Sequence, residues 1–97
     1  MHHYVYKVTN LITNEFYIGK HDSKFLWNTY MGSGRMITDA INKYGVKSFK
    51  KEILKSFLTG REAADYENKL ILENKDNPLA YNKSLIKFKY SWNSIHI

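Results

Sequence analysis

Two aromatic triplets near the start of the chain, Tyr4-Val5-Tyr6 and Tyr17-Ile18-Gly19, most strongly limit what this chain can fold into. The first lies in a run, residues 4–9, that alternates large apolar and mixed side chains, and the second lies in another aromatic and β-branched run. Both compositions are typical of β-strands. Asn10 and Asn14 bracket the polar segment between the runs. The pattern therefore predicts two short strands joined by a turn.

The length of that turn decides whether the tyrosines of the two strands share a face of the sheet. A two-residue turn at Thr13-Asn14 pairs Tyr6 with His21 and Tyr17 with Asn10. Because side chains alternate between the faces of a sheet, this register gathers one set of side chains on a single face. The set is Tyr4, Tyr6, Val8, Tyr17, Gly19 and His21. A loop of odd length would separate the two tyrosines, and tyrosines also occur in strands simply because they favour them.

Helical patterns follow the hairpin in two places. Apolar residues recur at helical spacing between Ser33, the expected N-cap, and Gly45, a glycine of the kind that ends helices. Thr59 and Glu62 have the spacing of a capping box, which predicts the start of a second helix that reaches about Asn74.

Residues 49–57 lie between these helices and have a strand-like pattern, with Phe49, Ile53 and Phe57 expected on one face. The chain is therefore predicted to form an α+β fold, in which a small three-stranded antiparallel sheet is flanked by helices. A last run, residues 86–92, alternates aromatic and basic side chains. It could add a strand that closes the core, bind DNA through its lysines, or join two copies of the chain as a homodimer.

Composition limits the classes of protein that remain. A chain of 97 residues is expected to form one domain, residues 1–97, with no separate DNA-recognition domain. Its net charge of +6 suits a surface that binds phosphates. The absence of cysteine excludes a disulfide framework and suits an intracellular protein. No apolar run is long enough to span a bilayer, which disfavours a membrane role.

The tyrosine motifs resemble those of the GIY-YIG nuclease family, and in particular the catalytic module of small phage-type homing endonucleases. Tyr6, Tyr17 and Gly19 match the family motif at its usual spacing, whereas Tyr4 replaces its first glycine. The resemblance covers about residues 4–83 and includes Tyr30-Met31-Gly32-Ser33-Gly34-Arg35 and Lys43-Tyr44-Gly45. It implies a DNA endonuclease that hydrolyses phosphodiester bonds in the cytoplasm of a bacterial or phage-infected cell.

Glu67 is the candidate metal ligand. It lies at the centre of an apolar stripe on the second predicted helix, formed by Ala63, Ala64, Leu70 and Ile71. A carboxylate is costly on a packed face without a partner, so Glu67 lies at the hydrated edge of the stripe, pairs with a lysine, or binds a metal. The resemblance favours the metal, since the family holds one divalent cation, Mg²⁺ or Mn²⁺, on a glutamate at this position.

The resemblance also implies a cation that stabilises the charge of the reacting phosphate. The family normally supplies an arginine shortly after its second motif, where this chain has Trp27. Arg35, at the start of a predicted helix, is the preferred substitute, and Arg61 is the alternative. Lys20 is expected to bind the same phosphate, and Tyr30 to replace another side chain of the family's site.

The remaining roles concern the attacking water. Tyr6 is expected to take its proton, directly or through His21, if nearby cations lower the pKa of the phenol from about 10. Tyr17 is expected to position the water or a phosphate oxygen. Asn82 matches a family asparagine that packs beside the site, although it could also be a simple turn residue.

Two other classes of function fit the same sequence. A relative that has lost catalysis could still bind nucleic acid through the basic surface and regulate a transcript or compete with a nuclease. A structural or inhibitory protein could use the aromatic run at residues 86–92 as its interface. The first would bind DNA without cutting it, and the second would form a stable dimer.

Overall fold

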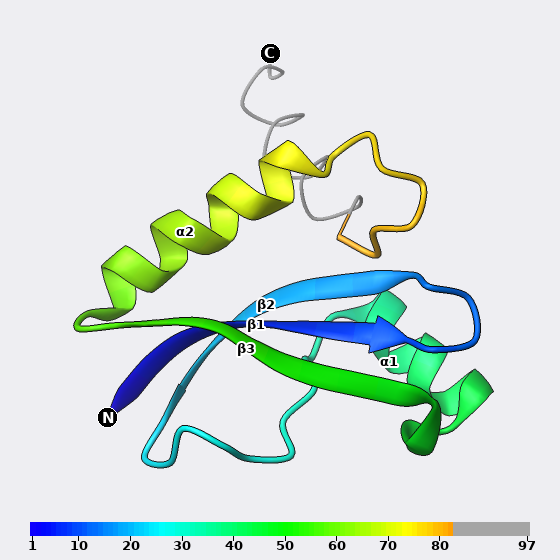
Figure 1. The fold of residues 1–97 in the computed structure, drawn as a ribbon, viewed down its shortest axis with the longest axis horizontal. Helices are drawn as coiled ribbons and strands as arrows, with labels where there is room; N and C mark the ends of the chain where they lie inside the picture. The colour runs from blue at the N-terminus through cyan, green and yellow to red at the C-terminus, as the bar shows by residue number, and fades with distance from the viewer. Residues whose placement is uncertain (83–97) are drawn as a thin grey trace.

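A computed structural model describes residues 1–82 as a three-stranded sheet with a helix on each face (Figure 1). All strands are antiparallel to their neighbours, in the order β2-β1-β3, which confirms the predicted α+β fold. The elements follow in the order β1 (His2–Asn10), β2 (Phe16–Ser23), α1 (Arg35–Tyr44), a 3₁₀ turn (Val46–Ser48), β3 (Phe49–Phe57) and α2 (Gly60–Glu73). The predicted strand at residues 86–92, and the homodimer it could form, lie outside the described residues.

The β1–β2 hairpin has a longer turn than the sequence predicted. Tyr6 lies opposite Gly19 and Val8 opposite Tyr17, so the register differs by two residues from the predicted pairing of Tyr6 with His21. The backbone N–H of Asn10 donates to the carbonyl of Glu15 at 2.8 Å, which leaves a four-residue loop, 11–14. A shift of two residues keeps every side chain on its predicted face. The predicted pairing was therefore wrong, but the predicted set of side chains on one face is correct.

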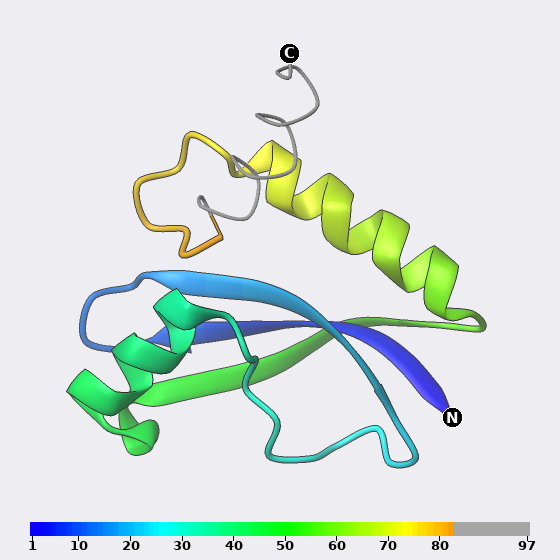
Figure 2. The same ribbon diagram turned by 180° about the vertical axis from the view of Figure 1, so that it is seen from behind.

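The two faces of the sheet support separate apolar clusters. One contains Tyr4, Tyr6 and Val8 of β1 together with residues of α1, and the other contains Val5 and Ile18 together with residues of α2. Figure 2 shows the molecule from behind, with α1 and α2 on opposite sides of the strands. The tyrosine face is thus the α1 face, while Glu67 comes from the helix on the other face.

A β-bulge in β3 changes which of its residues share a face. Ile53 lies opposite Tyr6, but the next pair joins Lys55 to Val5, so the pairing skips Leu54. Because one extra residue reverses the alternation, Phe49 and Ile53 pack on the tyrosine face whereas Phe57 packs on the α2 face. The prediction that all three share a face was wrong for Phe57.

The helix ends are partly as predicted. Thr59 and Glu62 form the complete capping box at the start of α2, and Gly45, with φ of 86°, follows the last residue of α1. The N-cap of α1 is Gly34 rather than the predicted Ser33, and no side chain among residues 1–82 caps this end. Within residues 1–82, neither helix has the length and apolar character needed to cross a membrane.

Candidate active site

The hydroxyl group of Tyr6 lies over Gly19 on the edge strand β2. A β-carbon added at Gly19 would stand 2.5 Å from Cζ of Tyr6 and 2.8 Å from Cε2 of Tyr17, which is too close for real atoms. The rings of Tyr6 and Tyr17 have centroids 6.2 Å apart. A glycine is therefore required at this position because the two phenols occupy the space that a side chain would fill.

The segment that leads into α1 packs against the same two rings. Gly32 has φ of 116°, a conformation that suits glycine, and a β-carbon there would lie 2.8 Å from Cε2 of Tyr17 and 3.2 Å from the hydroxyl of Tyr6. A β-carbon at Gly34 would lie 3.6 Å from the hydroxyl of Tyr17. The N-terminus of α1, with its backbone N–H groups, therefore begins next to the Tyr17 hydroxyl.

Both phenols are held in their protonated form. Burial raises the pKa of Tyr6 far above its ordinary value, and Tyr17, Tyr30 and the charge of Glu67 act in the same direction. The pKa of Tyr17 is also raised, first by burial and then by Glu67, while a hydrogen bond with Tyr6 partly offsets the rise. The sequence had led us to expect a lowered pKa for Tyr6, but the protein's own groups raise it.

The negative charge of Glu67 acts on both of these hydroxyls, since it raises the pKa of Tyr6 and of Tyr17. It is half-buried on α2, whose Ala63 and Ile71 are fully buried against the sheet. Within residues 1–82, no three His, Asp or Glu side chains gather into a ready-made metal cage. A cation at Glu67 would therefore take its other ligands from water and substrate, which suits Mg²⁺ better than a metal that prefers several protein ligands.

His21 and Tyr30 form a stacked pair beside the tyrosines. Their rings are nearly parallel, with centroids 3.9 Å apart, and the edge of His21 also meets the ring of Tyr4. The ring of Tyr30 packs edge-on against Tyr6 at 6.1 Å. Burial lowers the pKa of His21, and the nearby Lys51 ammonium lowers it further. The imidazole is thus favoured in its neutral form, which can accept a proton.

Lys51 is a part of the site that the sequence analysis overlooked. Its side chain is 8% exposed, and its ammonium donates to the hydroxyl of Tyr4 at 3.2 Å and to the backbone and side-chain oxygens of Asn28, both at 3.1 Å. Asn28 in turn donates to Tyr4 and accepts from the backbone N–H of Tyr30. Lys51 thereby ties the loop between β2 and α1 to the sheet and helps to hold Tyr30 on His21.

A signal for Lys51 was present in the sequence. It lies between Phe49 and Ile53 at a spacing of two in each direction, so strand alternation places it on their apolar face. A lysine among apolar residues of one face must satisfy its ammonium there or extend to the edge.

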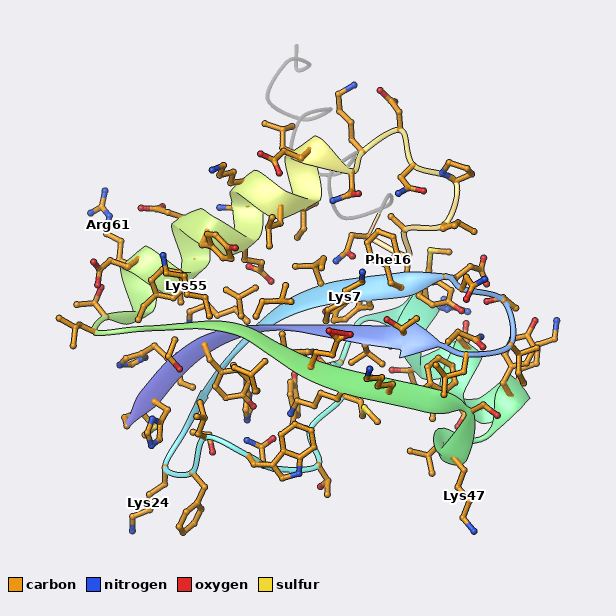
Figure 3. All side chains as sticks on the ribbon, in the orientation of Figure 1. Lys7, Phe16, Lys24, Lys47, Lys55 and Arg61 are labelled. Atoms are coloured by element: carbon orange, nitrogen blue, oxygen red, sulfur yellow. The ribbon has the colours of Figure 1, made fainter. Side chains whose placement is uncertain are left out.

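The three predicted basic residues are not brought together. Arg35 directly follows Gly34 at the start of α1, but its side chain is 92% exposed and lies 3.7 Å from Asp39. Lys20 belongs to the opposite face of the sheet, where it pairs with Asp22 at 2.9 Å. Arg61 projects away from the sheet at the start of α2 (Figure 3). Of these, Arg35 alone starts from the backbone segment that touches Tyr17.

Asn82 fastens the chain after α2 to the edge strand. Its side-chain carbonyl accepts from the N–H of Ile18 at 2.9 Å, and its amide donates to the carbonyl of Ile18 at 2.8 Å. Backbone bonds at Phe16, with Leu79 and Tyr81, precede this pairing. Asn82 is 3% exposed, and Ile18, to which it bonds, lies between Tyr17 and Gly19 in β2. Asn82 therefore positions the strand that carries these two residues.

Comparison with known proteins finds relatives of one kind. The chain is similar to phage endonucleases. It is 49% identical over 71 residues to "Putative endonuclease segE", 41% over 86 residues to "Putative endonuclease segB" and 37% over 82 residues to "Endonuclease segA", all of Enterobacteria phage T4. These alignments cover 73%, 88% and 84% of the chain.

The chain spans only 35%, 39% and 37% of the lengths of these curated relatives. No family model matches it, and no solved structure matches it significantly. The likeness therefore applies to one part of each relative, and it covers most of the segment that carries the two tyrosine motifs, α1 and α2.

Proposed function

We propose that this chain is a catalytic unit of the GIY-YIG type that hydrolyses phosphodiester bonds in DNA. The observation that carries the proposal is the meeting of the Tyr6 and Tyr17 phenols over Gly19, within the electrostatic reach of Glu67. The names of the T4 relatives support an endonuclease, and their phage origin supports an activity in infected bacterial cells.

In the proposed reaction His21, rather than Tyr6, accepts the proton of the attacking water. A base must be unprotonated before the reaction, and the pKa of His21 is lowered whereas that of Tyr6 is raised. The protonated phenols of Tyr6 and Tyr17 are then hydrogen-bond donors, which can hold the water or the oxygens of the phosphate. Donors fixed in advance at developing negative charge need no reorganisation during the reaction.

Glu67 would hold the divalent cation, Mg²⁺ or Mn²⁺. One carboxylate is enough for Mg²⁺, because this ion keeps several waters and takes oxygens from the substrate phosphate. When bound, the ion supplies Lewis-acid stabilisation of the phosphate charge. The charge of Glu67 supports this site, because it adds to the rise in pKa that burial causes at Tyr6 and Tyr17.

Arg35 and the N-terminus of α1 would bind the scissile phosphate together. Gly34, the N-cap of α1, lies beside the Tyr17 hydroxyl, and Arg35 is the first residue of the helix. Its side chain is exposed and its contact to Asp39, at 3.7 Å, is weak, so it can turn toward a bound phosphate. Lys20 would have to leave Asp22 to act at the same phosphate, and its place on the α2 face makes it a ligand for a neighbouring one.

Cleavage of supercoiled plasmid tests the proposal. With Mg²⁺ we expect nicked or linear products, and we expect none with EDTA or with Glu67→Ala. Glu73→Ala is the matched control, because it removes an exposed carboxylate from the same helix and should leave cleavage unchanged. Equal cleavage by the two variants would exclude Glu67 as the metal ligand. Plasmid that is retarded on a gel but never cut would instead favour a DNA-binding protein without catalysis.

A further inference from the structure

The loop between β2 and α1 exposes three consecutive large apolar residues. Phe25 is 69% exposed, Leu26 40% and Trp27 62%. Within residues 1–82, no other three consecutive residues are all large, apolar and exposed. Exposing such a group to water costs free energy, and a group of this kind often marks a site of interaction with a partner.

The backbone of this loop is held inward while the apolar side chains remain outside. The N–H of Phe25 donates to the hydroxyl of Ser23 at 3.2 Å, and the carbonyl of Phe25 accepts from the Asn28 side chain at 3.3 Å. Asn28 is fixed to Lys51 and Tyr4 on the sheet. The hydrogen bonds of Phe25 with Ser23 and Asn28 lie on either side of the three residues and therefore present Phe25, Leu26 and Trp27 in a preformed arrangement.

The surroundings of the loop are basic. Lys24 extends from its tip, away from the sheet (Figure 3). The ammonium of Lys51 lies 5.4 Å from the centre of the Trp27 ring on its protein side. The whole chain carries a net charge of +6. Apolar side chains among cations match a polyanion whose interior is a stack of apolar bases, and they match a purely apolar partner poorly.

The loop is also close to the candidate active site. Asn28, which fixes the loop, bonds to the backbone N–H of Tyr30, and Tyr30 stacks on His21. We propose that Phe25, Leu26 and Trp27 form a wedge that stacks on or inserts between the DNA bases next to the scissile phosphate. The wedge rests on the proposed function, because it assumes that the substrate is DNA.

The wedge would give the enzyme a way to hold distorted DNA. Apolar side chains that enter a base step unstack it and bend the duplex, and the bend brings more phosphates to the protein. Steps that unstack easily, such as pyrimidine–purine steps, would be preferred. The proposal therefore predicts a preference for flexible steps, mismatches or nicked sites near the cut.

Fluorescence of Trp27 tests this wedge directly. The chain has two tryptophans, so Trp92→Phe leaves Trp27 as the sole indole. We would titrate this variant with a short duplex in EDTA, and follow binding independently by the anisotropy of a dye on the DNA. We expect Trp27 emission to be quenched, and its access to acrylamide to fall, as the DNA saturates.

Alanine substitutions give the second arm of the test. Trp27→Ala should weaken DNA binding by about 5- to 150-fold, the range for losing one stacked base, without changing the dependence of affinity on salt. Lys24→Ala should instead reduce the salt slope by about 1. Ile12→Ala is the control, because Ile12 is also 62% exposed but belongs to the β1–β2 loop, and it should bind as the parent does.

The outcomes separate the wedge from the proposed function. DNA that saturates the protein by anisotropy while Trp27 emission and acrylamide access stay constant would overturn the wedge and leave the nuclease intact. Trp27 emission that changes with protein concentration before DNA is added would overturn it in favour of self-association. No DNA binding at any salt concentration would overturn both proposals.

Discussion

The close approach of Tyr6 to Gly19 makes Gly19→Ala a severe test of the site. The new β-carbon would stand 2.5 Å from Cζ of Tyr6 and 2.8 Å from Cε2 of Tyr17. Ordinary contact begins at about 3.4 Å, so the Tyr6 ring must move by about 1 Å. Tyr6 is 1% exposed and has the rings of Tyr4, Tyr17 and Tyr30 around it, so it has little room to move.

Two magnitudes follow from this displacement. Forcing extra volume into a packed core costs about 1–3 kcal/mol, and the loss of chain entropy in the unfolded state returns about 0.4–1 kcal/mol. Taken at the middle of each range, these two terms lower the free energy of unfolding by about 1.3 kcal/mol, or about 5–10 °C in melting temperature for a domain of this size. A 1 Å error in a reacting group costs about 100-fold in rate, so cleavage should be reduced far more than folding.

Urea unfolding and single-turnover plasmid nicking would be measured on the same preparations. Gly60→Ala is the control, since a β-carbon there meets its nearest neighbour at an ordinary 3.5 Å. We expect Gly60→Ala to match the cleavage of the parent and to gain about 0.4–1 kcal/mol in stability from the same entropy term. If Gly19→Ala behaved in the same way, Tyr6 would not lie over Gly19, and the geometry of the site would be wrong.

Three further predictions concern His21, Lys51 and Asn82. Because the folded-state pKa of His21 lies below its unfolded value, the protonated imidazole is disfavoured in the fold. Both stability and cleavage should therefore decline as pH falls from about 6.5 through the folded pKa. Lys51→Met removes a cation that lowers this pKa, so an NMR titration should show it raised, and an unchanged value would contradict the Lys51 contact. Asn82→Ala leaves the buried N–H and C=O of Ile18 without partners. At about 1–3 kcal/mol for each group, this loss should cost about 2–6 kcal/mol in urea unfolding and speed amide exchange at Ile18. Exchange as slow as in the parent would refute the two hydrogen bonds between Asn82 and Ile18.

Strand alternation explains why much of the tyrosine face could be predicted from the sequence. The turn after Asn10 was placed wrongly, yet the shift of two residues left Tyr6, Tyr17 and His21 on the same side. The face on which a side chain lies depends only on whether the register shifts by an even or an odd number of residues. The boundaries of β3 and α2 were predictable for a similar reason, since strong local patterns mark them.

The errors arose where tertiary contacts override local pattern. Nothing in residues 49–57 marks Leu54 as the bulged residue, so Phe57 was assigned to the wrong face. Gly34 rather than Ser33 caps α1, because the backbone at Gly32 must first fit over Tyr17. The network of Lys51 depends on Asn28, a loop residue whose position follows from no periodic pattern.

Asn82 also fixes the point from which the rest of the chain departs. Its side chain grips Ile18, so a segment that continues beyond it starts beside the strand of Tyr17 and Gly19. A second DNA-binding unit joined to the chain after Asn82 would be tethered from a fixed point beside the candidate active site. Its contact with DNA would then raise the local concentration of substrate at the phenols, and the reach of the tether would set how far from that contact the cut falls.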